Sequence, residues 1–340
     1  RDPLFPHLVA GGFVVPKELD ELAAIEDRYE RERANPAFLV TILPTFGCNL
    51  GCSYCFVGRK RGTMGRETQD RLVALVRSRI AERAPPRLSV DWFGGEPLLA
   101  LDVIERVSRK LQETTAARGM PYSAQVITNG TRITEEAVRV LEGAGVDRLQ
   151  VTLDGPKPVH DRRRPAKSRH APSPFDETLS SLDRAVGRFR IRLRVNVDAE
   201  NLEGAWDLLE LFQTRGWLGP DSGFHPYLAR ISPFTDACAS VASRVVGLEE
   251  FQAFNLAWME RLHAAGVPVA MHALYGFPAP KSYNCGAVGE GALIFNPDGE
   301  IHRCGLCVDD PSEAVGHLET GIDPEGPNVR KWQAWSPLAN

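Results

Sequence analysis

The sequence contains no long hydrophobic run and no large excess of charge. No stretch approaches the roughly eighteen consecutive apolar residues of a membrane-spanning helix. No basic segment followed by an apolar one opens the chain, so secretion is not indicated. The formal net charge is only −4 in 340 residues, which is not the basic field typical of nucleic-acid-binding proteins. We therefore expect a cytoplasmic protein that has neither a membrane nor a nucleic acid as its partner.

Cysteine is also scarce, with an odd total of seven residues. In a reducing compartment such cysteines are better explained as metal ligands or buried thiols than as disulfides. Three of them, Cys48, Cys52 and Cys55, stand together, and no fourth ligand lies near them in the sequence. A structural zinc site uses four nitrogen or sulfur ligands, whereas three thiolates leave one iron of a [4Fe–4S] cube open. The Cys-x3-Cys-x2-Cys spacing therefore favours an iron–sulfur cluster that binds a small molecule.

This triplet, within the segment 45–56, resembles the signature of the radical SAM enzymes. The resemblance implies a [4Fe–4S] cluster that binds S-adenosylmethionine (SAM) and cleaves it reductively to a 5′-deoxyadenosyl radical, which abstracts hydrogen from a substrate. It also implies an external electron donor such as flavodoxin or ferredoxin. Cys48, Cys52 and Cys55 are thus the expected catalytic and metal-binding residues, and Phe56 is an expected contact of the cofactor.

Short apolar runs alternate with helical stretches along most of the chain. Six such strand–helix units in succession are typical of a parallel sheet in an α/β fold. Six are too few for a closed eight-stranded barrel, so we predict the partial (β/α)6 barrel that the resemblance implies. The predicted strand and helix pairs are 38–43 and 67–84, 88–93 and 101–118, 124–127 and 135–143, 149–153 and 175–186, 191–197 and 202–214, and 224–231 and 248–265.

Two smaller parts flank the predicted barrel, which we place at residues 37–270. Residues 1–36 form an N-terminal helical extension, because apolar side chains recur at helical spacing over residues 16–34. This helix is expected to lie on the barrel. Residues 271–340 form a small C-terminal module. The chain begins at Arg1 and not at a methionine, so we expect it to be a fragment or a trimmed chain.

The segment Gly94-Gly95-Glu96-Pro97 follows the second predicted strand. Two glycines let a backbone come close to a ligand, and the carboxylate of Glu96 can accept hydrogen bonds from a cationic amine. By itself the segment is also a plain turn. At this distance after the cysteine loop it is similar to the family segment that contacts the methionyl amine of SAM. We therefore expect all four residues to bind the cofactor.

Further polar residues stand near the ends of the next three predicted strands, where functional residues gather in such sheets. Thr152 is similar to a nucleoside-binding hydroxyl of the family. Arg194 and Asn196 alternate with apolar neighbours, which points both into the barrel. Two structural explanations stay open: the Asn-Gly and Asp-Gly pairs form ordinary turns, and Arg194 is a buried arginine paired with a carboxylate. The expected cofactor-binding residues of this group are Thr128, Asn129, Thr152, Asp154, Arg164, Arg194 and Asn196.

A second group of cysteines, Cys285, Cys304 and Cys307, lies near the C-terminus. The residues between them predict a β-hairpin over 293–302, which brings Cys285 and Cys304 near each other. The order Cys285, Gly299, Cys304 resembles the opening of the SPASM or twitch module of radical SAM enzymes, which carries auxiliary [4Fe–4S] clusters. These three cysteines give at most three ligands for an auxiliary cluster, and no cysteine follows Cys307. We therefore expect at least one auxiliary cluster in a module that is truncated, or that a peptide thiol or another residue completes.

The segments 93–99 and 151–164 are similar to those of maturases of ribosomally made peptides (RiPP maturases). We therefore expect an oxidoreductase that forms thioether, carbon–carbon or ether crosslinks in a precursor peptide. Anaerobic sulfatase maturases, which make formylglycine, have Gln and Asp where this chain has Phe93 and Gly305, so a formylglycine-forming enzyme would lack its general base. The same motifs are also compatible with a small-molecule radical SAM enzyme of cofactor biosynthesis and with a non-catalytic iron–sulfur protein.

Overall fold

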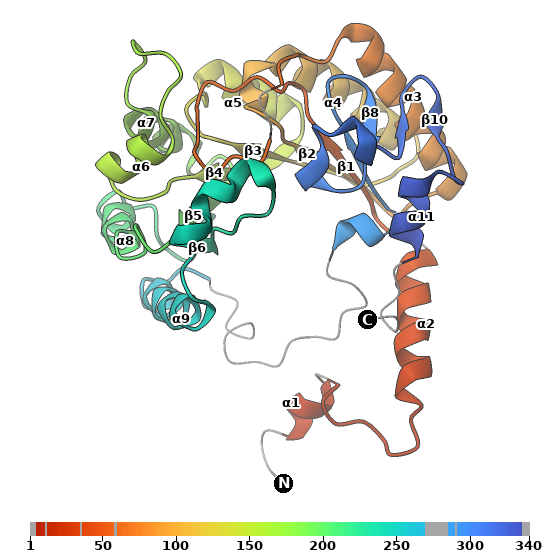
Figure 1. Cartoon of the computed structure of the whole chain (residues 1–340), viewed down its shortest axis with the longest axis horizontal. Helices are drawn as coiled ribbons and strands as arrows, with labels where there is room; N and C mark the ends of the chain where they lie inside the picture. The colour runs from red at the N-terminus through yellow and green to blue at the C-terminus, as the bar shows by residue number, and fades with distance from the viewer. Residues whose placement is uncertain are drawn as a thin grey trace.

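A single curved sheet forms the centre of the computed structural model, which describes residues 5–10, 12–34, 36–57, 60–268, 285–289 and 291–334. Within these residues the strand order is β10-β9-β8-β7-β1-β2-β3-β4-β5-β6 (Figure 1). Six neighbouring strands pair in parallel and in sequence order. They are β1 (Phe38–Ile42), β2 (Leu88–Trp92), β3 (Tyr122–Thr128), β4 (Val146–Thr152), β5 (Arg190–Val197) and β6 (Phe224–Arg230).

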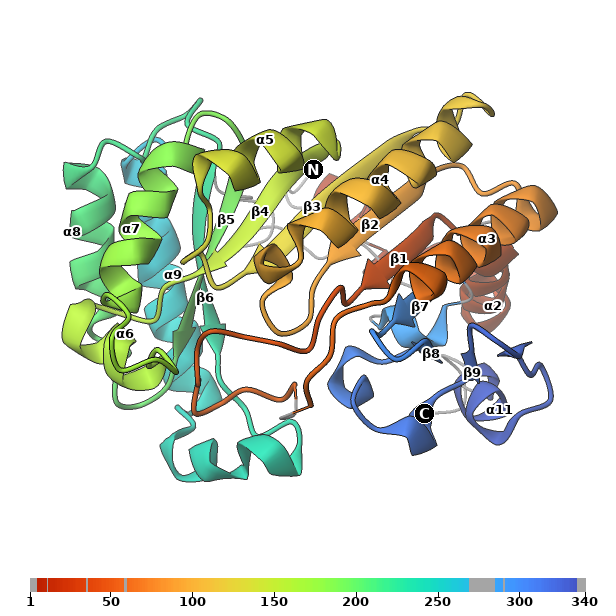
Figure 2. The ribbon, with the colours of Figure 1, turned by 90° about the horizontal axis from the view of Figure 1, so that it is seen from above.

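A helix layer covers the outer, convex face of this sheet (Figure 2). One main helix follows each parallel strand, so the predicted six strand–helix units and the open partial barrel are confirmed. The helices are α3 (Arg66–Arg83), α4 (Leu101–Ala116), α5 (Glu135–Gly143), α7 (Pro174–Ala185), α8 (Ala205–Thr214) and α9 (Leu248–Ala264). Three short elements that the sequence analysis missed also lie in the loops: η1 (Pro97–Leu99), α6 (Lys157–Arg163) and η2 (Asp236–Arg244).

The two faces of the parallel strands differ in burial, because successive side chains of a strand point to opposite sides. In β2, Val90 and Trp92 are fully buried, whereas Ser89 and Asp91 are only half-buried. The buried set packs with helix side chains such as Ile104 into one hydrophobic core. The opposite set forms the concave face of the partial barrel and leaves polar side chains there.

The C-terminal residues continue the sheet of the barrel. Strands β7 (Ala292–Phe295) and β8 (Glu300–His302) form the predicted antiparallel hairpin. Strand β7 also pairs in parallel with β1, with Leu39 opposite Ala292 and Ile42 opposite Phe295, which the sequence analysis did not predict. The predicted domain boundary at 270/271 lies outside the described residues. The remaining elements of this region are η3 (Gly286–Val288), η4 (Gly305–Cys307), η5 (Pro311–Glu313), β9 (Gly316–His317), β10 (Gly321–Ile322) and α11 (Pro327–Gln333).

The N-terminal segment differs from its prediction. It forms α1 (Phe5–Ala10) and α2 (Glu21–Ala34), and α2 begins five residues later than predicted because Asp20 caps it, accepting a hydrogen bond from the backbone N–H of Ala23 (3.0 Å). Leu22 is 65% exposed, so the expectation that the apolar side of this helix lies on the barrel is wrong there. Figure 1 shows α2 extending away from the sheet. Among the described residues, no helix is both long and apolar enough to cross a membrane.

Candidate functional site

The cysteine-bearing loop connects β1 to α3 and runs across the C-terminal ends of the strands (Figure 2). Backbone hydrogen bonds fasten it to the segment after α6. The N–H of Gly51 donates to the carbonyl of Pro165 (2.8 Å), and the N–H of Lys167 donates to that of Asn49 (2.9 Å). Leu50 and Ala166 form an isolated bridge between the same segments. The three thiols therefore lie where parallel sheets place their functional groups.

The two glycines of the segment after β2 are required by contact with this loop. The N–H of Glu96 donates to the carbonyl of Gly47 (2.7 Å). A Cβ atom on Gly95 would stand 2.1 Å from that same carbonyl oxygen, and Gly94 has φ of +130°. The sequence analysis assigned these glycines to close approach of a ligand, and the structure gives them a close approach between two backbone segments. Pro97 is buried at the start of η1.

Glu96 joins the ends of β2 and β3. Its buried carboxylate accepts hydrogen bonds from the hydroxyl of Thr128 (2.7 Å) and from the backbone N–H groups of Asn129 (2.8 Å) and Leu98 (3.1 Å). Burial raises the pKa of Glu96, and these hydrogen bonds oppose the shift. Three donors leave about one of the four acceptor positions of a carboxylate open. Glu96 is thus a structural link, and a contact with the SAM amine stays a prediction.

Asn129 lies against the first cysteine. Its Nδ2 donates to the Sγ of Cys48 (3.7 Å) and to the Oδ1 of Asn49 (2.9 Å). Its own Oδ1 accepts from the backbone and the hydroxyl of Thr131 (2.9 and 2.8 Å), and Nδ2 of Asn49 donates to that hydroxyl (2.8 Å). The sequence analysis predicted Asn129 but missed Asn49 and Thr131. This small network orients a donor toward a cysteine thiol.

Tyr54, between the second and third cysteines, is the centre of a second network that the sequence analysis missed. Its hydroxyl donates to Asp154 and accepts from Nη1 of Arg164 (2.5 Å) and Nδ2 of Asn196 (3.1 Å). Burial and the neighbouring Asp154 raise the pKa of Tyr54 well above its usual value, against the opposing charge of Arg164. The sequence signal that could have identified Tyr54 is the presence of an aromatic residue within the cysteine triplet. Three predicted site residues therefore converge on one unpredicted side chain.

Buried ion pairs lie next to the residues that contact Tyr54. Nη1 of Arg163 donates to Asp198 (2.7 Å), and its Nε lies 3.8 Å from Asp154. Both carboxylates are inaccessible to solvent, and removing one partner of such a pair leaves a buried charge. His160 accepts from the backbone N–H of Asp154 (3.1 Å). Burial lowers the pKa of His160 to about 3, so this imidazole is neutral near pH 7.

The other predicted contacts occupy the same end of the sheet. Thr152 is buried and lies opposite Arg194 in the pairing of β4 with β5. Nε of Arg194 donates to Oδ1 of Asn196 (2.7 Å), so the alternative that this arginine pairs with a carboxylate is wrong within the described residues, and a cofactor contact stays a prediction. The ring of Phe56 stacks on that of Phe93 with centroids 6.0 Å apart.

The thiols of the loop fit an iron–sulfur cluster. Burial raises the pKa of Cys48, Cys52 and Cys55, that of Cys52 to about 11, while the charge of Arg164 opposes the shift at Cys52. Thiolate ligands form as metal binds. Within the described residues no three His, Cys, Asp or Glu side chains converge as one metal ion requires. A cube binds each thiolate at a different iron, so such a cluster does not require the three sulfurs to converge on one point.

Cys304 and Cys307 lie together at η4, and burial followed by the neighbouring Cys304 raises the pKa of Cys307 to about 12. Cys285 is exposed at the start of η3. Nη1 of Arg303 donates to the carbonyl of Gly289 (2.5 Å), which ties the segment after Cys285 to the residue before Cys304. A shared cluster for these three cysteines stays a prediction.

The concave face contributes polar groups that the sequence analysis did not single out. Burial raises the pKa of Asp91, opposed by a hydrogen bond from Gln125 and the charge of Arg148. The hydroxyl of Tyr227 donates to Gln150 (2.9 Å). Strand alternation was the signal that could have found Asp91, Gln125 and Tyr227, because each stands between two buried apolar residues. These side chains line the space that lies next to the cysteine loop.

Comparisons with known proteins agree with this architecture. Residues 42–212, half of the chain, match the family model of the radical SAM superfamily. The AdoMet-dependent heme synthase of Methanosarcina barkeri (strain Fusaro / DSM 804) is 32% identical over 178 residues, which cover 51% of this chain and 46% of that protein. The chain thus matches less than half the length of this curated relative.

Two solved structures share the fold. Native anSMEcpe with bound AdoMet and Cp18Cys peptide has a TM-score of 0.65 at 18% identity, covering 87% of this chain and 82% of that one. Streptococcus suis SuiB bound to precursor peptide SuiA has a TM-score of 0.60 at 12% identity, covering 93% and 71%. The cysteine loop and the strand-end residues described above all lie within the matched residues 42–212. The chain belongs to the radical SAM superfamily of enzymes.

Proposed function

We propose that this chain is a radical SAM maturase that forms a thioether, carbon–carbon or ether crosslink in a precursor peptide. A cluster bound by Cys48, Cys52 and Cys55 would supply reductive cleavage of SAM and, through the resulting 5′-deoxyadenosyl radical, removal of a hydrogen atom from the peptide. The observation that carries the proposal is the fixed position of this cysteine loop over the strand ends, beside an open polar concave face.

The residues around the loop have distinct tasks in this proposal. Asn129 donates to the sulfur of Cys48, and the charge of Arg164 favours the thiolate of Cys52, so both stabilise the ligand form of the thiols. Arg164, Asp154 and Asn196 gather at the ends of β4 and β5. Together they offer two donors and one acceptor for the polar groups of SAM.

The C-terminal cysteines are proposed to hold an auxiliary [4Fe–4S] cluster in a SPASM-like or twitch-like module within residues 271–340. A hydrophobic cluster connects this region to the cysteine loop: Val308 and Ile294 pack with Phe46 and Val57. A group bound at Cys304 and Cys307 would therefore be mechanically coupled to the loop. A fourth ligand from outside the described residues, or from the peptide itself, completes the site in this proposal.

Two observations support a peptide as the substrate. Within the described residues, β6 is the last strand at its edge of the sheet, so the concave face stays open there. An extended peptide can enter from that side. Both solved structures of this fold contain a bound peptide. Among reactions on peptides, formylglycine formation is disfavoured, because Gly305 follows Cys304 directly, where its proton acceptor is expected. An external flavodoxin or ferredoxin supplies the electron in this proposal.

Sequence similarity to the heme synthase favours a small-molecule substrate as a second candidate. Arg148, Arg192 and Arg194 lie on the concave strands, and such a row suits a substrate that carries carboxylates. A change in mass of an added peptide would separate the two candidates.

The test is formation of 5′-deoxyadenosine by anaerobically reconstituted, reduced protein, followed by mass spectrometry of a short peptide encoded beside the gene. We expect the wild type to cleave SAM and the Cys48→Ala/Cys52→Ala/Cys55→Ala variant to make none. Cys238→Ala is the matched control, because that thiol lies against Thr235 in η2. Unchanged SAM cleavage by the triple variant contradicts the cluster assignment, and cleavage without any peptide product contradicts the maturase assignment.

A further inference from the structure

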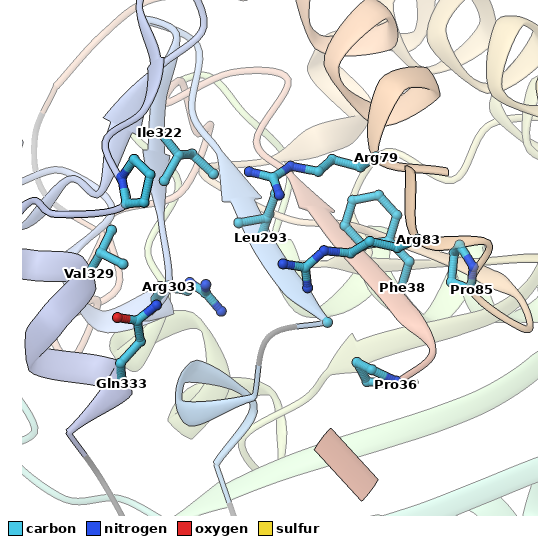
Figure 3. Close-up of a pocket in the computed structure, with 12 residues that line it drawn as sticks. Pro36, Phe38, Arg79, Arg83, Pro85, Leu293, Arg303, Ile322, Val329 and Gln333 are labelled. Atoms are coloured by element: carbon cyan, nitrogen blue, oxygen red, sulfur yellow. The ribbon is translucent and has the colours of Figure 1, made fainter. Parts of the chain in front are cut away.

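A cavity lies at the end of the sheet opposite the cysteine loop, on its helix-covered side. It has a volume of about 350 Å³ and is enclosed by α3, the beginnings of β1 and β7, and the C-terminal elements β10 and α11. Figure 3 shows the side chains of Arg79 and Arg83 extending from α3 toward Leu293, with Arg303 on the other side. We call it the arginine cavity. Nothing in the proposed reaction uses it.

The lining of the arginine cavity is positively charged. Arg79 and Arg83 lie one helical turn apart on α3, and Arg303 is held at the opposite wall by its hydrogen bond to Gly289. No acidic side chain is among the described residues that line it. Among the described acids next to lining residues in the sequence, Asp323 accepts a hydrogen bond from the backbone N–H of Glu325 (3.0 Å), and Glu82 accepts one from the hydroxyl of Ser78 (2.6 Å).

Arg79 is the lining arginine whose charge has no partner among the described residues. It is half-buried and, unlike Arg71 on the same helix, which pairs with Glu67 and Glu319, it makes no hydrogen bond or ion pair with the residues that the structure describes. A guanidinium group in a partly desolvated position is most stable when a carboxylate binds it through two parallel hydrogen bonds. The cavity therefore presents a carboxylate site at Arg79.

Apart from Gln333, the rest of the lining is apolar and selects against a bare inorganic anion. Phe38, Leu293 and Val329 are buried at the cavity wall, with Ile322 half-buried between them, and three prolines complete it. Such a wall is stabilised when apolar surface covers it. A ligand that satisfies both features has carboxylates next to aliphatic groups.

We propose that the arginine cavity binds an acidic, aliphatic segment of the peptide substrate, away from the residue that is modified. This rests on the proposed function. The cavity begins at Phe38 on the helix-covered side of the sheet, and the cysteine loop begins after Ile42 at the other end of β1. Five residues of strand span about 16 Å, and the route around the sheet adds about 10 Å. The recognised segment is thus separated from the modified residue by roughly eight extended residues.

The test is fluorescence anisotropy with a labelled octapeptide of alternating leucine and glutamate, in low salt, without SAM or reductant. We expect saturable binding to the wild type, no binding of the matching leucine–glutamine octapeptide, and affinity lowered at least about tenfold by Arg79→Gln. Arg79→Lys keeps the charge and is expected to lose less. Arg139→Gln, on the exposed surface of α5, is the control for a general loss of positive charge, and circular dichroism of each variant checks its folding.

Equal binding of the two octapeptides overturns the proposal, as does unchanged affinity in folded Arg79→Gln. Displacement of the probe by inorganic phosphate or free glutamate at the concentration of the peptide also overturns it, because the site is then one for small anions. The binding assay needs neither cluster nor SAM. A failure to form 5′-deoxyadenosine therefore contradicts only the proposed function. If the protein modifies its peptide but shows no change in anisotropy with the octapeptide, only the proposed role of the arginine cavity is contradicted.

Discussion

Nη1 of Arg164 donates to the hydroxyl of Tyr54 over 2.5 Å, and this bond connects the cysteine triplet to the segment that follows β4. The two residues are 110 positions apart in the sequence. Because Tyr54 stands between two cluster cysteines, the position of Arg164 and the shape of the loop depend on each other.

Removing the Tyr54 hydroxyl is therefore expected to weaken both the fold and the loop. In Tyr54→Phe the buried groups of Asp154 and Arg164 lose a partner, which costs about 1–3 kcal/mol of unfolding free energy. Urea denaturation measures this, and iron content after reconstitution reports on the loop. Tyr227→Phe is the matched control, because its half-buried hydroxyl bonds to the neutral Gln150. Equal stability losses in both variants would contradict a special role for Tyr54.

Gly95 is expected to tolerate no side chain. A methyl group there overlaps the carbonyl oxygen of Gly47 at 2.1 Å, so Gly95→Ala must push the segment after β2 away from the cysteine loop. Such overpacking costs about 1–3 kcal/mol, measurable as a lower Tm. Gly65→Ala is the control, because nothing lies within 4 Å of its Cβ position and its φ is −68°. A Tm of Gly95→Ala equal to that of the control contradicts the contact.

His160 is expected to make stability depend on pH. Its pKa of about 3 in the folded protein lies below the usual value near 6.5, so the unfolded chain binds the extra proton between these values. Its contribution to stability is therefore full above pH 6.5 and is lost as pH falls toward 3, by up to about 1.4 kcal/mol per pH unit.

Urea denaturation at pH 7 and pH 5 tests this dependence. His160→Asn, whose side-chain oxygen can accept from Asp154, is expected to lose less stability between the two pH values than the wild type. His170→Asn, at an exposed position, is expected to follow the wild type. An identical pH dependence in all three proteins argues against a buried neutral His160.

The C-terminal cysteines are expected to act after SAM cleavage. Cys304→Ala should keep 5′-deoxyadenosine formation, lose about four iron atoms per chain and give no crosslinked peptide. Cys48→Ala should lose cleavage and product together. Unchanged iron content in Cys304→Ala shows that no auxiliary cluster forms there.

Local patterns were sufficient for the elements and for the cysteine loop. Short apolar runs between helical stretches located all six parallel strands. The strand ends located Asn129 and Asp154, and alternation along the fifth strand located Asn196. The partners that hold these residues were not predictable in this way. Asp198 and Arg163 are 35 positions apart, and no spacing rule connects them before the fold brings β5 and α6 together.

The C-terminal hairpin shows a second limit. The run Ala292–Phe295 is apolar on both faces, which fits an independent hairpin and an inner strand equally well. Only its pairing with β1 decides between them. The prediction for α2 was wrong for the opposite reason. Its apolar spacing correctly indicated a helix, but the side chain of Leu22 stays exposed and packs on no other element.

The pairing of β7 with β1 has a practical consequence for dissecting the protein. Strand β1 leads into the cysteine loop, and β7 supplies the hydrogen-bond partners along its other side. In a chain cut before residue 285, those backbone N–H and C=O groups of β1 would be unpaired. A strand of a second molecule can then pair with this exposed edge. Deleting the C-terminal region is therefore expected to produce aggregates and not a minimal catalytic core.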